Sequence, residues 1–169
     1  MKPLASWVAA IALVGVGALV GAVPRRSPDQ AFIDRAASIH EGQLDLARLA
    51  GRKATNEEAR RLAARLERQH RASLQRLLDL AARNDLIVPN RLQDPEVQRF
   101  KRLDRLKGLP FDEAYVAAMA SVEASAAAVF EEEASAGKSG ALRAYAAGEL
   151  PMLRSQAALA RRDLERPRR

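Results

Sequence analysis

The feature that most constrains this chain is the stretch from Thr55 to Asn84, whose apolar residues keep one helical period from end to end. Residues three and four positions apart share one face of a helix, while Arg and Glu occupy the rest of its circumference. Thr55 followed by Glu58 predicts a capping box at the start of this helix. The shared stripe consists of Leu62, Ala63, Leu66, Ser73, Leu77 and Leu80.

Three further stretches show the same period, over residues 29–51, 111–135 and 141–162, the last loosened at Pro151, which cannot donate to the helical ladder. A short helix is expected after Asp94, as its cap, and Pro95. The turn at 51–54 is too short for anything but an antiparallel return. The sequence therefore predicts an all-α fold, an up-and-down four-helix bundle with a short extra helix in the connection between its second and third helices.

The composition agrees with closely packed helices. None of the 169 residues is cysteine, which excludes disulfides, thiol nucleophiles and thiolate metal sites. Aromatic residues make up only 4% of the chain, and alanine and leucine dominate its apolar part. Sheets favour β-branched and aromatic residues instead.

An uncharged segment at residues 4–23 follows Lys2 and predicts either a cleaved signal peptide or an N-terminal membrane anchor, within residues 1–23. The small residues before the end of the segment suit a signal peptidase, whereas Arg25 and Arg26 directly after it oppose translocation. Both alternatives predict export, to the periplasm or to an inner-membrane anchor that faces it. A linker at 24–30, a bundle domain at 31–165 and a basic tail at 166–169 would follow.

The net charge of +7 raises the question of a nucleic-acid partner. The arginines are interleaved with Glu and Asp and have no aromatic platform among them, so we expect no nucleic acid to bind. Contact with an anionic membrane or envelope polymer stays open. The residues for such a contact are Arg161, Arg162, Arg166, Arg168 and Arg169.

Polar residues interrupt the apolar stripe of each long helix. They are Gln43, Gln69, His70, Glu123 and Gln156. Cofactor sites in helix bundles are built from such positions, and Glu67 with His70 forms one Glu-x-x-His unit of the kind that di-iron bundles use twice. A metal held by His70 and Glu123, with His40 or Glu67, is one interpretation. The alternative, which we favour, is a hydrogen-bonded polar layer that fixes the register of the bundle.

Between Asp29 and about Ala160, the chain resembles the bacterial domain of unknown function 4142, a ferritin-like four-helix family often labelled as outer membrane proteins. The landmarks that carry the resemblance are Ala31-Phe32, Leu46, Leu49-Ala50, His70, Leu103, Leu106, Gly108, Phe111-Asp112, Tyr115, Phe130, Leu150-Pro151 and Leu153. It implies a ferritin-like fold and association with the outer membrane. Members usually carry Glu at the position of Gln43 and His at those of His70, Glu123 and Gln156, so the resemblance implies an eroded metal site.

The sequence as a whole predicts an exported cell-envelope protein, a non-catalytic interaction or stress-related module that needs no cofactor. One alternative is a ferritin-like protein that binds a divalent metal at a degenerate site. Another is a binder of an anionic envelope polymer or membrane surface.

Overall fold

The computed structural model describes residues 26–165, and every regular element within that range is a helix. The five helices are α1 (Pro28–Lys53), α2 (Glu57–Arg83), α3 (Asp94–Asp104), α4 (Gly108–Ala136) and α5 (Gly140–Glu165). The predicted all-α fold is confirmed. The predicted signal peptide or anchor at 1–23 and the basic tail at 166–169 lie outside the described residues.

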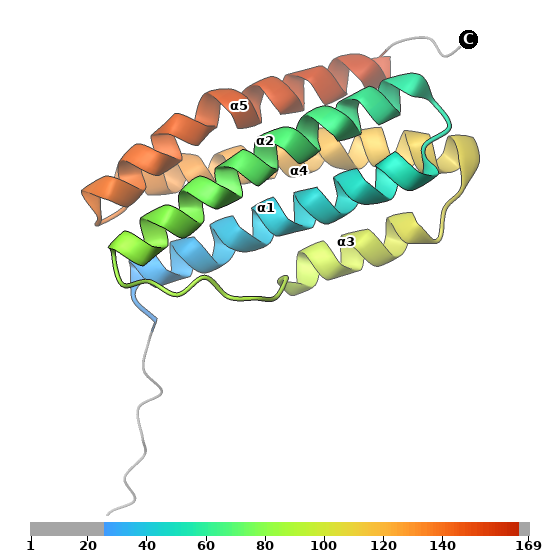
Figure 1. The fold of residues 1–169 in the computed structure, drawn as a ribbon. Helices are drawn as coiled ribbons and strands as arrows, with labels where there is room; N and C mark the ends of the chain where they lie inside the picture. Colours follow the sequence, from blue (N-terminus) through green and yellow to red (C-terminus); the bar gives the residue numbers. More distant parts are fainter. Residues whose placement is uncertain (1–25, 166–169) are drawn as a thin grey trace, which may run out of the picture.

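The long helices form two antiparallel hairpins, α1 with α2 and α4 with α5, and α3 lies along α1 and α4 (Figure 1). Asp112 near the start of α4 accepts hydrogen bonds from Thr55, just before α2, so α2 and α4 begin at the same end and run in the same direction. The predicted up-and-down order therefore fails at this link. The connection at 84–107 is long enough to carry the chain back along the molecule before α4 starts.

The start of α2 differs from the predicted capping box. Asn56 occupies the cap position, and its side chain accepts a hydrogen bond from the Glu58 amide at 2.7 Å. The Thr55 hydroxyl instead donates to Asp112 at 2.6 Å. Asp112 also accepts from the Asn56 amide at 2.8 Å, so a carboxylate from α4 satisfies backbone donors ahead of α2. This contact joins the two hairpins, so it could not be predicted from a local sequence motif.

Other helix ends lie close to their predicted positions. Ser27 caps α1 through the Gln30 amide, with Pro28 in the first turn where its missing N–H costs nothing. Asp94 is the first residue of α3 rather than its cap, which is Gln93. Pro151 lies inside α5, as predicted.

The apolar core consists of two clusters rather than one. One cluster lies towards the end where α2 and α4 begin and includes Leu66 and Tyr115. The other lies towards the opposite end and includes Phe32, Phe130 and Leu153. Buried polar side chains of all four long helices lie between them, so the middle of the molecule is a polar layer.

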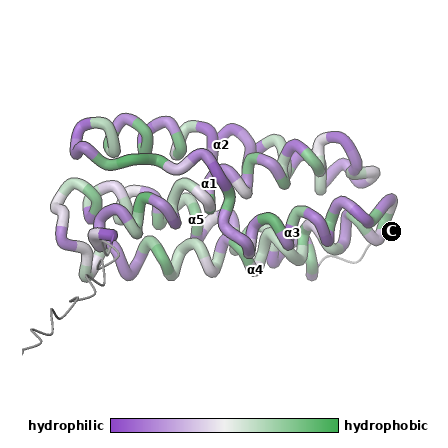
Figure 2. Tube along the Cα trace, turned by 90° about the horizontal axis from the view of Figure 1, so that it is seen from below, coloured by the Kyte–Doolittle hydropathy of each residue, from purple (hydrophilic) through white to green (hydrophobic). Residues whose placement is uncertain are grey.

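The fourth helix is apolar around most of its circumference, as its largely green and white tube in Figure 2 shows. By length and composition α4 would be able to cross a membrane, but 44% of its most apolar window is buried in this fold. The core helices of folded domains meet the same criteria. Its inner face carries Tyr115, Met119, Glu123 and Phe130 into the core.

Candidate functional site

A continuous line of polar side chains crosses the middle of the molecule, from α5 through α1 and α2 to α4. The Tyr145 hydroxyl lies 2.9 Å from Nε2 of His40, and Nδ1 of His40 lies 3.0 Å from Nδ1 of His70. Nε2 of His70 lies 3.2 Å from Oε1 of Glu123. His40, His70 and Glu123 are fully buried. Each long helix contributes one member, so the line forms only when the two hairpins are docked.

The positions of the protons in this line follow from counting donors and acceptors. Tyr145 has one hydroxyl proton, which the geometry directs to the backbone carbonyl of Ser73 at 3.1 Å. His40 then donates from Nε2 to the Tyr145 oxygen, and its Nδ1 accepts from Nδ1 of His70. One further proton must lie between Nε2 of His70 and Oε1 of Glu123. The His70–Glu123 pair is then neutral overall, in keeping with the cost of burying an uncompensated charge.

A second proton arrangement runs in the opposite direction. Tyr145 would donate to His40, His40 to His70, and His70 to a Glu123 carboxylate, with one proton fewer in total. That arrangement leaves a single negative charge in the sealed layer. The two arrangements differ by one proton, and the one without net charge is the one that burial favours.

Burial shifts the pKa values of two members of the line, His40 and Tyr145. Burial, followed by the charges of His70 and Arg76, lowers the pKa of His40 well below 6.5, so its imidazole is neutral. Burial also raises the pKa of Tyr145, with a smaller contribution from Glu149, so its hydroxyl keeps its proton.

A second polar group lies beside this line. The Ser73 hydroxyl donates to Glu149 at 2.7 Å, and the Arg76 guanidinium donates to the same carboxylate at 2.6 Å. Gln156 donates to Gln69 at 2.8 Å. These contacts again join α2 to α5, so they tie one hairpin to the other.

Several polar atoms in the layer have no hydrogen-bond partner within the described part of the protein. Both side-chain polar atoms of Gln43 are in this state, and so are Oε2 of Glu123, the Tyr115 hydroxyl and Oε1 of Gln156. Burial, followed by the nearby charge of Glu123, raises the pKa of Tyr115. Unpartnered polar atoms of the layer therefore lie on α1, α4 and α5 alike.

The predicted metal ligands are only partly brought together. His70 and Glu123 are in contact, but His40 meets the opposite nitrogen of the His70 ring, so His40 and Glu123 face different points. Glu67 is one-third exposed, 3.7 Å from Arg48, and it also pairs with Arg71. Over residues 26–165, no three His, Asp or Glu side chains gather where they could hold one ion.

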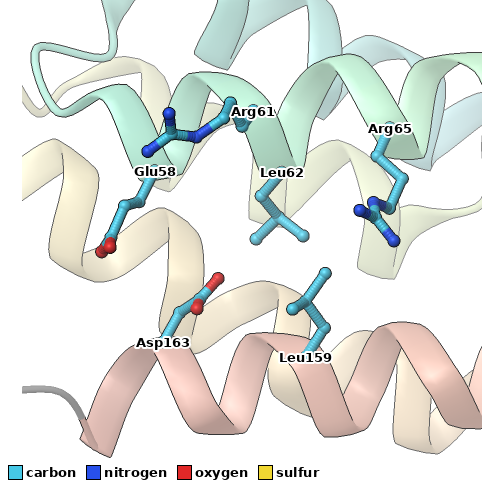
Figure 3. Close-up of a pocket in the computed structure, with 6 residues that line it drawn as sticks. All are labelled: Glu58, Arg61, Leu62, Arg65, Leu159 and Asp163. Atoms are coloured by element: carbon cyan, nitrogen blue, oxygen red, sulfur yellow. The ribbon is translucent and has the colours of Figure 1, made fainter.

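Hollows lie on several faces of the described part of the protein, and in five of them no member of the polar layer forms the lining. Figure 3 shows the one between α2 and α5, where Leu62 and Leu159 face each other and charged side chains, Arg65 and Asp163 among them, form its rim. His70 and Glu123 have no exposed surface, so both are closed off from solvent in this structure.

Two residues of the layer, Tyr145 and Glu149, were not among the sequence-based candidates. Glu149 lies on the buried stripe of α5, which continues through residues 142, 146, 149, 153 and 156, so extending that stripe would have identified it. Tyr145 lies beside the stripe, and only the packing against His40 reveals its role.

Comparison with known protein families matches residues 20–162 to the Domain of unknown function (DUF4142). The chain belongs to the DUF4142 family. This confirms the resemblance drawn from the order of its landmarks. A search of curated proteins gave no match for this DUF4142 chain.

Two solved structures share its helical arrangement. A DUF305 fragment from Deinococcus radiodurans has a TM-score of 0.73 and 14% identity, covering 85% of this chain and 100% of the fragment. A DUF305 protein from Streptomyces coelicolor has a TM-score of 0.64 and 16% identity, covering 78% of this chain and 87% of the other. At such identities the likeness of the DUF4142 chain to these proteins concerns the fold alone.

Proposed function

We propose that this DUF4142 protein is an exported component of the cell envelope, whose ferritin-like four-helix bundle acts as a non-catalytic interaction or stress-related module without a cofactor. The observation that supports this proposal is the closure of the polar layer. His70 and Glu123 are fully buried, and no described hollow leads to them. A reacting group must come within hydrogen-bond reach of its substrate. These groups contact only one another and neighbouring helices.

The role left to the layer is structural. Its hydrogen bonds cross from α2 to α4 and α5, and from α1 to α5. Polar contacts of this kind select one packing register, because any other register strands buried polar groups. The outer surface, rather than the core, is then the part that meets other molecules.

Thermal unfolding with and without divalent metals tests the proposal. A metal that binds only the folded state would raise the Tm of the protein. We expect no such binding, so Zn²⁺, Fe²⁺ or Mn²⁺ added to the metal-free protein should leave its Tm unchanged. A rise of many degrees that disappears in the Glu123→Gln variant would contradict the proposal.

A reporter fusion tests export. Alkaline phosphatase fused after residue 30 should be active in a bacterial host, and an inactive fusion that stays in the cytoplasm would contradict the proposed export.

A second candidate, a ferritin-like protein with a degenerate metal site, is favoured by one observation. Oε2 of Glu123 has no hydrogen-bond partner in the described structure, while Oε1 of the same carboxylate lies 3.2 Å from His70. A divalent ion bound to both residues would replace the shared proton. Elemental analysis of untagged protein decides the matter, and less than about a tenth of an equivalent of metal per chain would end this candidate.

A third candidate is contact with an anionic envelope polymer or membrane surface. Arg161 and Arg162 are exposed in the last turn of α5, directly before the basic tail. Such binding weakens as salt screens the charges. Binding to anionic material that persists unchanged at high salt, or after deletion of residues 161–169, would contradict this candidate.

A further inference from the structure

Basic side chains gather at one end of the molecule. We define the basic end as residues 52–65, 101–113 and 161–165, which hold eleven Lys and Arg against seven Asp and Glu. The opposite end, residues 26–38, 76–91 and 131–149, holds seven basic and eight acidic residues. The positive charge of the described chain is therefore unevenly distributed along the helices.

The three segments of the basic end lie together in space. Lys53 at the end of α1 reaches Asp104 at the end of α3 at 3.0 Å, and Thr55 bonds to Asp112 in α4. The last turn of α5 lies at this end as well, on the right of Figure 1, where Asp163 lines a hollow with Glu58. Most of the cations there are exposed, namely Arg52, Arg60, Arg61, Arg65, Lys101, Arg102, Arg105, Lys107, Arg161 and Arg162.

Two exposed leucines stand among these cations. Leu109, in the first turn of α4, is 53% exposed, and Leu164, in the last turn of α5, is 38% exposed. Neither packs into an apolar cluster of the core. Both leucines lie at helix ends, so they belong to the surface of the basic end and not to a side face of the bundle.

The combination of cations and leucines distinguishes between possible anionic partners. A soluble polyanion would satisfy the arginines but offers nothing to Leu109 and Leu164, which would stay in water. The surface of an anionic bilayer offers phosphates to the cations and an apolar layer directly beneath them. Each leucine that enters that layer adds the favourable transfer of its side chain from water.

We propose that the basic end docks on an anionic lipid bilayer, with the cations at the phosphates and Leu109 and Leu164 at the boundary of the acyl chains. This inference rests on the proposed exported function only for its cellular setting. The helix axes then stand steeply on the membrane, because the patch lies across helix ends. Pro28, at the start of α1, then lies about 39 Å from the basic end, which is the length of the 26-residue helix α1.

The test uses the absence of cysteine from the chain to place one fluorescent reporter in the full-length protein. An environment-sensitive dye is attached to Leu109→Cys at the basic end, or to Ile87→Cys, which is 75% exposed in the connection after α2. Vesicles consist of phosphatidylcholine with or without phosphatidylglycerol. Emission from position 109 should shift to the blue with the anionic vesicles and return in high salt, while position 87 should not respond.

Charge variants provide the second measurement. Replacing Arg102 and Arg105 by Gln should weaken the vesicle-dependent shift at position 109 by about thirtyfold in lipid concentration, from the usual gain per cation near an anionic surface. The matched variant, with Arg83 and Arg91 replaced by Gln, should bind as before. Circular dichroism checks that each variant keeps its helices.

The outcomes separate this inference from the proposed function. The proposed lipid contact would be wrong if the emission of the dye at position 109 did not shift with anionic vesicles, or shifted equally with neutral ones. It would also be wrong if the emission shifted only with soluble polyphosphate. Those results would leave the non-catalytic, exported module untouched. Metal uptake or cytoplasmic retention would contradict that module without affecting the vesicle response.

Discussion

Mild acid should weaken this protein through His40. Burial holds the pKa of His40 well below 6.5 in the folded state, whereas the unfolded chain exposes the ring at its ordinary pKa. Between those two values the unfolded state binds a proton that the folded state does not. Stability is therefore fully present above about pH 6.5 and falls as the pH decreases below it.

The size of the effect follows from the same linkage. Each pH unit below the unfolded pKa removes up to about 1.4 kcal/mol, so His40 should account for about 2 kcal/mol of lost stability at pH 5. The groups around the ring are His70 and, at longer range, Arg76 from α2, Glu123 beyond His70 from α4, and Tyr145 from α5. None of them offers the buried ring a carboxylate in direct contact, so protonated His40 would be uncompensated.

Urea unfolding followed by circular dichroism, at a series of pH values from 8 to 5, measures this dependence. His40→Gln should be less stable at pH 8 because it breaks the polar line, but should lack the extra decline below pH 6.5. Glu41 and Glu133, whose pKa values burial raises, titrate alike in both proteins and cancel in the difference. Equal slopes in the two proteins would refute the reasoning.

Two further predictions concern stability. Asp112→Ala should lower the free energy of unfolding by about 2–3 kcal/mol, because three donors from Thr55 and Asn56 lose their acceptor. Thr55→Val removes only one of these donors and should cost about 1 kcal/mol. Urea unfolding measures both values, and equal losses would contradict this account. Gly51→Ala should stabilise α1 by about 0.5–1 kcal/mol, since nothing lies within 4 Å of the added carbon, while Gly42→Ala should destabilise, since its carbon would lie 2.6 Å from Cγ of Glu96. A gain in thermal stability for both glycine variants would show that α3 yields freely.

The helices were predictable from the sequence because their signal is local. Leu66, Val122 and Leu153 lie on stripes of helical period, and all three are buried. The direction of α4 was not predictable, because the sequence of the connection at 84–107 does not show whether it turns back at once or first crosses the length of the molecule.

The polar layer was predictable in its membership but not in its partners. Its helices place Gln43, His70 and Glu123 inward, as their period indicates. The sequence suggested His40 or Glu67 as a further ligand beside His70 and Glu123. In the structure His40 contacts the other ring nitrogen of His70, while Glu67 turns outward to Arg48. Rotation about the helix axis decides these contacts, and it is set by packing across the whole molecule.

The division into two hairpins has a consequence for assembly. The seam between them is tied by the His70–Glu123, His40–Tyr145 and Ser73–Glu149 contacts, and one long connection joins the halves. The first hairpin of one chain would find the same complementary surface on the second hairpin of another. At high concentration, or after partial unfolding at acidic pH, intertwined dimers made by reciprocal exchange of hairpins should accumulate, with each polar layer completed by the neighbouring chain.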